Sequence, residues 1–200
     1  MDDILTLSKL DSQLLVITPD RVQPPQLIER VLKMYDAELQ RASVKASLQI
    51  EKGYYEILDA QDYVMLDPSR LLQVVINLLT NAIKFTQYAN KRGLTIYLGA
   101  STARPTGVHH SITYIQPRTA RHEHSTALSS DWGHGRDIWL QLAVQDTGRG
   151  LSEEEMSLLF QRFSQASPKT YKKYGGSGNT NTISCLDVAW LSQLKCRPEQ

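Results

Sequence analysis

The sequence lacks the features of disulfide-rich, membrane-spanning and secreted proteins. It contains only two cysteines, Cys185 and Cys196, with no CxxC pair, which is typical of reduced thiols in an intracellular protein. No apolar run approaches the roughly 18 to 20 residues that a membrane span requires. The acidic start Met1-Asp2-Asp3 lacks the basic and apolar regions of a signal peptide. We therefore expect a cytoplasmic location.

An excess of charge is also missing. Lys and Arg together number 22 and Asp and Glu 21, so the formal net charge is +1. This balance gives no electrostatic argument for a nucleic-acid or membrane partner, and we expect no nucleic acid. The chain has no GxxxxGK[ST] motif, which excludes a P-loop as a phosphate site. What is present, with 41% hydrophobic residues, is the composition of one globular domain, alone or with attachments.

Periodicity predicts an apolar helical stripe at the N-terminus and mixed elements after it. The stripe fits a coiled coil or bundle as well as a helix packed on its own domain, and the prolines of 19–25 predict a linker. The stripe consists of Ile4, Leu7, Leu10, Leu14 and Ile17. Further helices are expected at 27–41, 67–85 and from 153, and strands at 44–50, 54–58, 63–66, 94–98 and 138–146. This order predicts an α+β fold with two layers.

The helix from Asp67 has two different faces. Asp67 followed by Pro68 is a strong helix start. Asn77, Asn81 and Lys84 share a polar face because they are spaced by four and three. Asn costs up to roughly 0.7 kcal/mol against Ala inside a helix, so the face is either a Mg²⁺-phosphate site or simply solvated. The apolar face, expected in the core, comprises Leu71, Val75, Leu78, Ala82 and Phe85.

A second polar motif, Asp146-Thr147-Gly148-Arg149-Gly150, follows the last predicted strand. A carboxylate there, backed by glycines, can accept a hydrogen bond from an exocyclic amine. Asp-Thr-Gly is also an ordinary turn, and it is the tripeptide of the aspartic proteases. Arg149, the single copy of the tripeptide and the asparagine helix all count against a protease.

The run from Asp67 to Thr86 closely resembles the N-box of histidine kinases. The resemblance implies that Asn81 holds Mg²⁺, that Asn77 supports the metal and its waters, and that Lys84 lies near the phosphates of ATP. Asn77 and Lys84 would then be the catalytic residues of this chain.

Three later motifs resemble other parts of the same family's nucleotide site. Residues 146–150 resemble the G1 box, which implies that Asp146 binds the adenine amine and that Gly148 and Gly150 line the pocket. Residues 159–163 resemble the F-box and 171–178 the opening of the G2 box. Phe160 would then anchor the lid over ATP, and Gly176 and Gly178 would let backbone N–H groups approach phosphate.

The resemblance implies a Bergerat-type two-layer α/β sandwich that binds ATP and Mg²⁺. Residues 1–18 would end a dimerisation helix, 19–178 would form the ATP-binding domain with a polar insertion at 101–137, and 179–200 would be a tail foreign to the family. The implied reaction is phosphoryl transfer from ATP to a histidine in phosphorelay signalling. The implied partners are a phosphoacceptor and dimerisation domain, a receiver domain and a second subunit, in the style of fungal hybrid kinases.

The match stops within the G2 box. The family continues with Leu-Gly-Leu, whereas Gly178 precedes Asn-Thr-Asn-Thr, so the domain would be incomplete at its C-terminus and the tail poorly ordered. All five histidines lie in 101–137, where His122-Glu123-His124 is either a metal site or, more simply, part of a polar loop. No phosphoacceptor motif is present, so we expect the chain alone to be inactive. The alternative function is a non-catalytic remnant that acts only by interaction.

Overall fold

The computed structural model describes residues 18–59, 61–106, 108–109, 112–113, 135–150, 182–184 and 194–197, the four shortest of these ranges by their backbone alone. The helices are α2 (Pro24–Met34), α3 (Asp36–Ala42), α4 (Lys52–Tyr55) and α5 (Pro68–Thr86). The strands are β1 (Asp20–Val22), β2 (Lys45–Ile50), β3 (Tyr63–Leu66), β4 (Gly93–Ser101), β5 (Val108–His109), β6 (Ile112–Thr113), β7 (Arg136–Asp146), β8 (Thr182–Ser184) and β9 (Leu194–Arg197).

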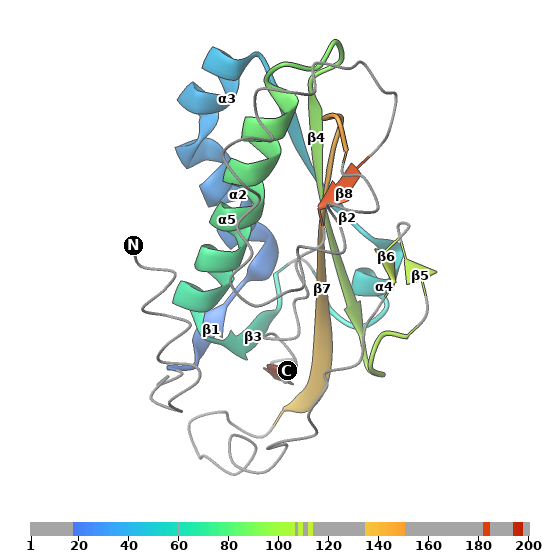
Figure 1. Ribbon diagram of the computed structural model, residues 1–200. Helices are drawn as coiled ribbons and strands as arrows, with labels where there is room; N and C mark the ends of the chain where they lie inside the picture. The colour runs from blue at the N-terminus through green and yellow to red at the C-terminus, as the bar shows by residue number, and fades with distance from the viewer. Residues whose placement is uncertain are drawn as a thin grey trace, which may run out of the picture.

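These elements form two layers, with α2, α3 and α5 on one side and the main sheet on the other (Figure 1). The order of strands in the sheet is β1-β3-β9-β7-β4-β2, and β8 also pairs with β7. The β2–β4 pair is parallel and the other pairs are antiparallel. The predicted α+β sandwich is therefore confirmed.

The core lies between the two layers. Ile28 and Val31 of α2 and Val75 and Leu79 of α5 are almost completely buried, as is Ile96 of β4. Burial of each such side chain contributes roughly 1.5 to 3 kcal/mol to folding. This packing fixes α5 over β4 and β7, the strands whose ends carry the Asp146 motif.

The predicted start of α5 is confirmed. Asp67 is the N-cap, and its carboxylate accepts hydrogen bonds from the backbone N–H groups of Ser69 at 2.9 Å and Arg70 at 3.2 Å. The N–H group of Thr18 also donates to this carboxylate, at 3.1 Å, which attaches the chain before β1 to the helix. Asp67 is buried, and these donors compensate for the loss of water.

Two predicted elements differ from the structure. The helix expected at 27–41 is divided at Tyr35 into α2 and α3. The strand expected at 54–58 was wrong, because α4 begins at Lys52. Tyr54 and Leu58 are both buried, and the N–H group of Leu58 donates to the carbonyl of Tyr54 at 2.8 Å. That spacing of four is helical, and the aromatic residues had indicated a strand.

The tail also departs from expectation. Residues 182–184 and 194–197 are strands, so the prediction of disorder was wrong for these two segments, and the rest of 179–200 lies outside the described residues. Strand β9 pairs with both β3 and β7 and therefore joins the β1–β3 pair to the remainder of the sheet. Within the described part of the chain, no helix has the length and apolar character to cross a membrane.

Candidate functional site

The last three turns of α5 carry the predicted polar face. Asn77 is half-buried, and Asn81 and Lys84 are exposed. At about 1.5 Å of rise per residue, Asn81 lies roughly 6 Å and Asn77 roughly 12 Å along the helix axis from Phe85. Thr80, between the two asparagines, donates its hydroxyl to the carbonyl of Ile76 at 2.8 Å. The two asparagine side chains and Lys84 thus point away from the helix–sheet core.

Asp146 ends β7 and is buried, with 1% of its surface exposed. Its Oδ1 atom accepts a hydrogen bond from the backbone N–H group of Gly148 at 2.7 Å. This bond closes the turn around the carboxylate and fixes its orientation. A buried carboxylate is costly unless it accepts hydrogen bonds. Its two oxygens have several acceptor positions, so a ligand can add a donor to those it already has.

Gly148 brings this turn against the C-terminal end of α5. A Cβ atom at this position would lie 2.7 Å from Oδ1 of Asp146 and 2.9 Å from the carbonyl oxygen of Phe85. Only glycine allows this approach. The turn that holds Asp146 is therefore packed directly against the end of α5. Asn81 and Lys84 belong to the last turns of the same helix.

Thr147 attaches the turn to the start of β4. Its hydroxyl donates to the carbonyl of Lys91 at 2.5 Å and accepts from the N–H group of Gly93 at 2.9 Å. Its own N–H group donates to the carbonyl of Gly93 at 3.1 Å. These three bonds extend the β4–β7 ladder by one residue beyond the Leu94–Asp146 pair. The turn is consequently held on two sides, by β4 and by α5.

The remaining predicted residues divide into one that is described and three that are not. Gly150 has φ 77°, a left-handed conformation that favours glycine, so its place in the motif has a conformational reason. Phe160, Gly176 and Gly178 lie outside the described residues, as do the helix expected from 153 and His122-Glu123-His124.

The end of α5 differs from the expected apolar face. Phe85 was predicted in the core, but it is 38% exposed, and Thr86 is completely buried in its place. The Lys84 ammonium lies 5.6 Å from the centre of the Phe85 ring, so the two side chains share the exposed side of the last turn. The period-3.6 pattern tolerated either residue at this end, and only the packed structure distinguishes them.

The donor set suits a hard cation held together with a ligand. Among the described residues no group of three or more His, Cys, Asp or Glu side chains forms a metal site of its own. Mg²⁺ takes one or two protein oxygens and completes its shell with water and phosphate. The exposed carboxamide of Asn81 has such an oxygen, and Lys84 adds a positive charge one turn later. These residues therefore fit a Mg²⁺-phosphate ligand.

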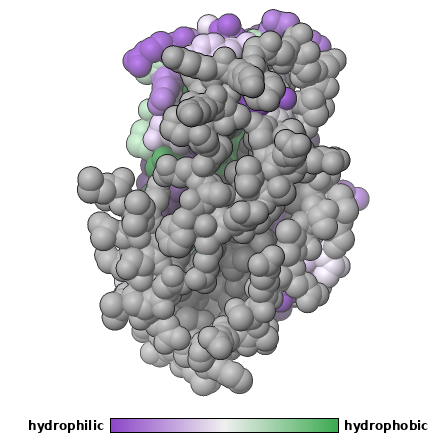
Figure 2. All heavy atoms as spheres, viewed as in Figure 1, coloured by the Kyte–Doolittle hydropathy of each residue, from purple (hydrophilic) through white to green (hydrophobic). Residues whose placement is uncertain are grey.

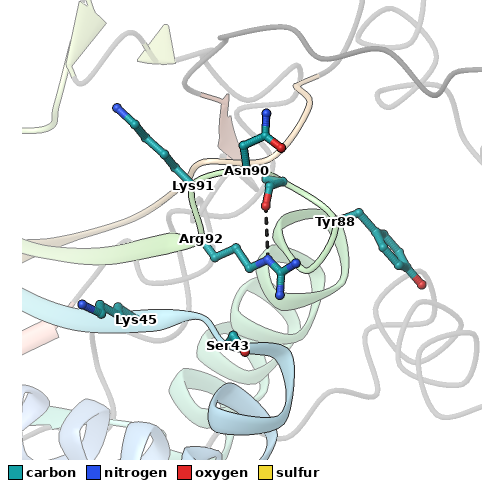
Figure 3. A pocket seen from close by; sticks show the side chains of 7 residues that line it. Ser43, Lys45, Tyr88, Asn90, Lys91 and Arg92 are labelled. Atoms are coloured by element: carbon teal, nitrogen blue, oxygen red, sulfur yellow. Dashed lines mark hydrogen bonds between the residues drawn. The ribbon is translucent and has the colours of Figure 1, made fainter.

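An open pocket of about 570 Å³ lies between the α5–β4 connection and the turn after α3 (Figure 3). Its lining includes no residue predicted from the sequence to belong to the site. The labelled lining residues are Ser43, Lys45, Tyr88, Asn90, Lys91 and Arg92. We refer to these six residues as the basic pocket.

Residues 66–184 match the family of histidine kinase-, DNA gyrase B- and HSP90-like ATPases. Histidine kinase 5 of Arabidopsis thaliana is 30% identical over 178 residues, which cover 89% of this chain and 17% of that protein. The signal transduction histidine-protein kinase BarA of Escherichia coli strain K12 is 26% identical over 178 residues, 89% of this chain and 15% of BarA. The chain thus spans less than a fifth of the length of these two relatives.

Among solved structures, the histidine kinase AdeS of Acinetobacter baumannii is 19% identical, with a TM-score of 0.47. The match covers 77% of this chain and 54% of the AdeS chain. Full-length ShkA in complex with AMPPNP is 17% identical, with a TM-score of 0.47. That match covers 76% of this chain and 24% of the ShkA chain. On the extent of the family match, the chain belongs to the histidine kinase-, DNA gyrase B- and HSP90-like ATPases and is homologous to two-component sensor histidine kinases.

Proposed function

We propose that the last turns of α5 and the Asp146–Gly150 turn form the two sides of a site for Mg²⁺ and ATP. The observation that supports this proposal is the contact of Gly148 with the end of α5. It brings the turn that holds the buried Asp146 against the helix that carries the exposed Asn81 and Lys84. The matching family is one of ATPases, and this chain has no P-loop motif, so other elements would have to hold the phosphates.

The adenine ring is assigned to the turn. Asp146 is oriented by the N–H group of Gly148 and by the attachment of Thr147 to β4. Its carboxylate accepts a hydrogen bond from the exocyclic amine of adenine. Guanine has a carbonyl oxygen at that position and cannot donate this bond. Gly148 and Gly150 have no side chain that would block the base. Base selectivity therefore depends on one buried acceptor.

The phosphates are assigned to the exposed face of α5. Asn81 supplies a carboxamide oxygen to Mg²⁺, Asn77 orients the metal and its waters, and Lys84 faces phosphate charge. Bound Mg²⁺ neutralises the charge that develops on the phosphates during transfer. Phe160, Gly176 and Gly178 complete the proposal as the lid anchor and the phosphate loop.

For the whole protein we propose phosphoryl transfer from ATP to a histidine of a dimerisation domain. A receiver domain would then accept the phosphoryl group from that histidine. This extension rests on the relatives, which are named as histidine kinases, and on their greater length. The fungal hybrid type, the dimerisation helix before residue 19, the homodimer and the break within the G2 box belong to the same proposal. A site that uses ATP also favours the cytoplasmic location. Membership of the ATPase family sets the aspartic-protease alternative aside.

A non-catalytic role remains the second candidate for this chain. The sequence after Gly178 lacks the Leu-Gly-Leu of the G2 box. A chain without those phosphate contacts would act by association with a complete kinase. The two candidates differ in whether the chain binds ATP at all.

Calorimetry with Mg-ATP on three proteins tests the proposal: the unaltered chain, Asp146→Asn and Asp137→Asn. Asp137 is the matched control, because it is an exposed aspartate near the opposite end of the same strand. We expect Asp146→Asn to weaken adenine nucleotide binding by roughly tenfold or more, the equivalent of one charge-assisted hydrogen bond of about 1.5 to 3 kcal/mol. Asp137→Asn should bind as the unaltered chain does. Equal affinity in all three proteins would refute the assignment of the base.

A further inference from the structure

We propose that the basic pocket is a docking surface for an acidic polypeptide segment. It lies where the turn after α3 meets the connection between α5 and β4, and it contains none of the residues assigned above to ATP. The same end of the molecule is predominantly hydrophilic where Figure 2 shows it in colour. Charge, rigidity and shape each favour this occupant.

The positive charge of the pocket is not compensated by either segment that forms it. Residues 39–50 and 68–122 contain no Asp or Glu, whereas they supply Lys45, Lys91 and Arg92 to the pocket. Lys45 and Lys91 are exposed, and within the described ranges no acidic side chain forms an ion pair with any of the three. The near-neutral net charge of the chain thus conceals a local excess of cations, which attracts an acidic surface.

The wall of the pocket is rigid. Nε of Arg92 donates to the carbonyl of Ala89 at 3.1 Å (Figure 3). A terminal guanidinium nitrogen of Arg92 donates to the carbonyl of Ala42 at 3.2 Å. The N–H group of Lys45 donates to the carbonyl of Arg92 at 3.0 Å. The two side-chain bonds use two of the five N–H donors of Arg92 and fix its plane. A preformed cationic wall reduces the entropy lost on binding.

The shape favours a polypeptide over a small molecule. Small-molecule sites bury about 70 to 90% of their ligand, whereas this pocket is open. Tyr88 lies at its rim, where its side chain is 72% exposed. Carboxylates along such a chain would reach Lys45 and Lys91, which lie on different segments of the wall.

The pocket is also connected to the turn assigned to adenine. The carbonyl of Lys91 accepts the hydroxyl of Thr147, and the N–H group of Gly93 donates to the same hydroxyl. A peptide that moves Lys91 would therefore displace the turn next to Asp146. This coupling rests on the proposed ATP site, whereas the docking surface does not.

A labelled polyglutamate peptide is the probe, titrated into the full chain by fluorescence anisotropy at low and at physiological salt. We expect binding that weakens with salt, and a loss of about tenfold in Lys45→Gln/Lys91→Gln. The matched control is Arg30→Gln/Lys33→Gln, two exposed cations of α2 with the same change in net charge. It should change the affinity by less than about twofold, as expected for distant screened charges.

Absence of peptide binding, or equal losses in the two double variants, would overturn the docking surface. Tighter binding of oligodeoxythymidylate through the same two lysines would overturn it in favour of nucleic acid. In ¹⁵N spectra the amide of Gly148 should shift when the peptide binds, and a stationary Gly148 signal would overturn the coupling. If the peptide binds and ATP does not, the docking surface stands and the proposed function fails.

Discussion

Gly148 and Phe85 meet at the point where the Asp146 turn contacts the end of α5. The position that a Cβ atom would occupy on Gly148 lies 2.9 Å from the carbonyl oxygen of Phe85, which is backbone and cannot rotate away. The contact fixes the separation between a buried carboxylate and the exposed polar face of the helix. Both the folding of this region and the proposed site depend on it.

We predict that Gly148→Ala lowers the free energy of unfolding by about 1 to 3 kcal/mol, the usual cost of overpacking. The added methyl group would press on the Phe85 carbonyl and on Asp146. Gly53→Ala is the control, because its Cβ would lie 3.5 Å from the carbonyl of Ala100, an ordinary contact. Urea denaturation of both variants measures the difference. Equal stability of Gly148→Ala and the unaltered chain would show that the turn does not press on α5.

Thr86 gives a prediction in the opposite direction. Its hydroxyl is buried and has no hydrogen-bond partner among the residues that the structure describes, an arrangement that costs about 1 to 3 kcal/mol. Thr86→Val keeps the shape and removes the hydroxyl, so the free energy of unfolding should rise by roughly 1 kcal/mol. Thr80→Val, which loses the bond to Ile76, should be neutral or destabilising. A fall in stability for Thr86→Val would mean that a water or ligand satisfies this hydroxyl.

The chain alone should not become phosphorylated on histidine. Its five histidines all lie within the polar stretch at 101–137, and the sequence has no phosphoacceptor motif. Incubation with labelled ATP and Mg²⁺, followed by acid treatment, tests this. Acid-labile phosphate on any histidine would show that the polar stretch contains an acceptor.

ATP should bind only weakly, with little advantage over adenosine. A complete G2 loop supplies backbone donors to the phosphates, and charge-assisted bonds contribute about 1.5 to 3 kcal/mol each. Losing two of them weakens binding roughly a hundredfold or more. Parallel calorimetry with ATP and adenosine measures the difference. A large preference for ATP would mean that residues after Gly178 contact the phosphates.

The sequence indicated the elements whose signals are local. The N-cap at Asp67 follows from an Asp-Pro pair, and the strand before Asp146 from strict alternation. The helix at Lys52 was missed because aromatic residues favour a strand, whereas burial of Tyr54 and Leu58 on one side is a tertiary effect. The break between α2 and α3 at Tyr35 could not be predicted, because no Gly or Pro lies next to it in the sequence.

The sequence indicated which residues to propose for the candidate site, but not how these residues pack. Asn77, Asn81, Lys84 and Asp146 stood out by their spacing and by the family resemblance. Thr86 is buried in the core instead of the predicted Phe85, and this depends on how the last turn of α5 packs against Gly148. The spacing of apolar residues along the helix does not reveal that packing. The place of β9 between β3 and β7 is likewise a long-range pairing, so the tail showed no local pattern.

The most direct test of the central claim is a ¹⁵N spectrum of the chain during titration with Mg-ATP. The account predicts shifts at the amides of Asp146, Gly148 and Asn81, with the amide of Asp137 unmoved because it lies near the other end of β7. Shifts confined to Ser43, Lys45 and Arg92 would place the nucleotide in the basic pocket instead. That result, or a spectrum that does not change at all, would contradict the assignment of ATP to α5 and the Asp146 turn.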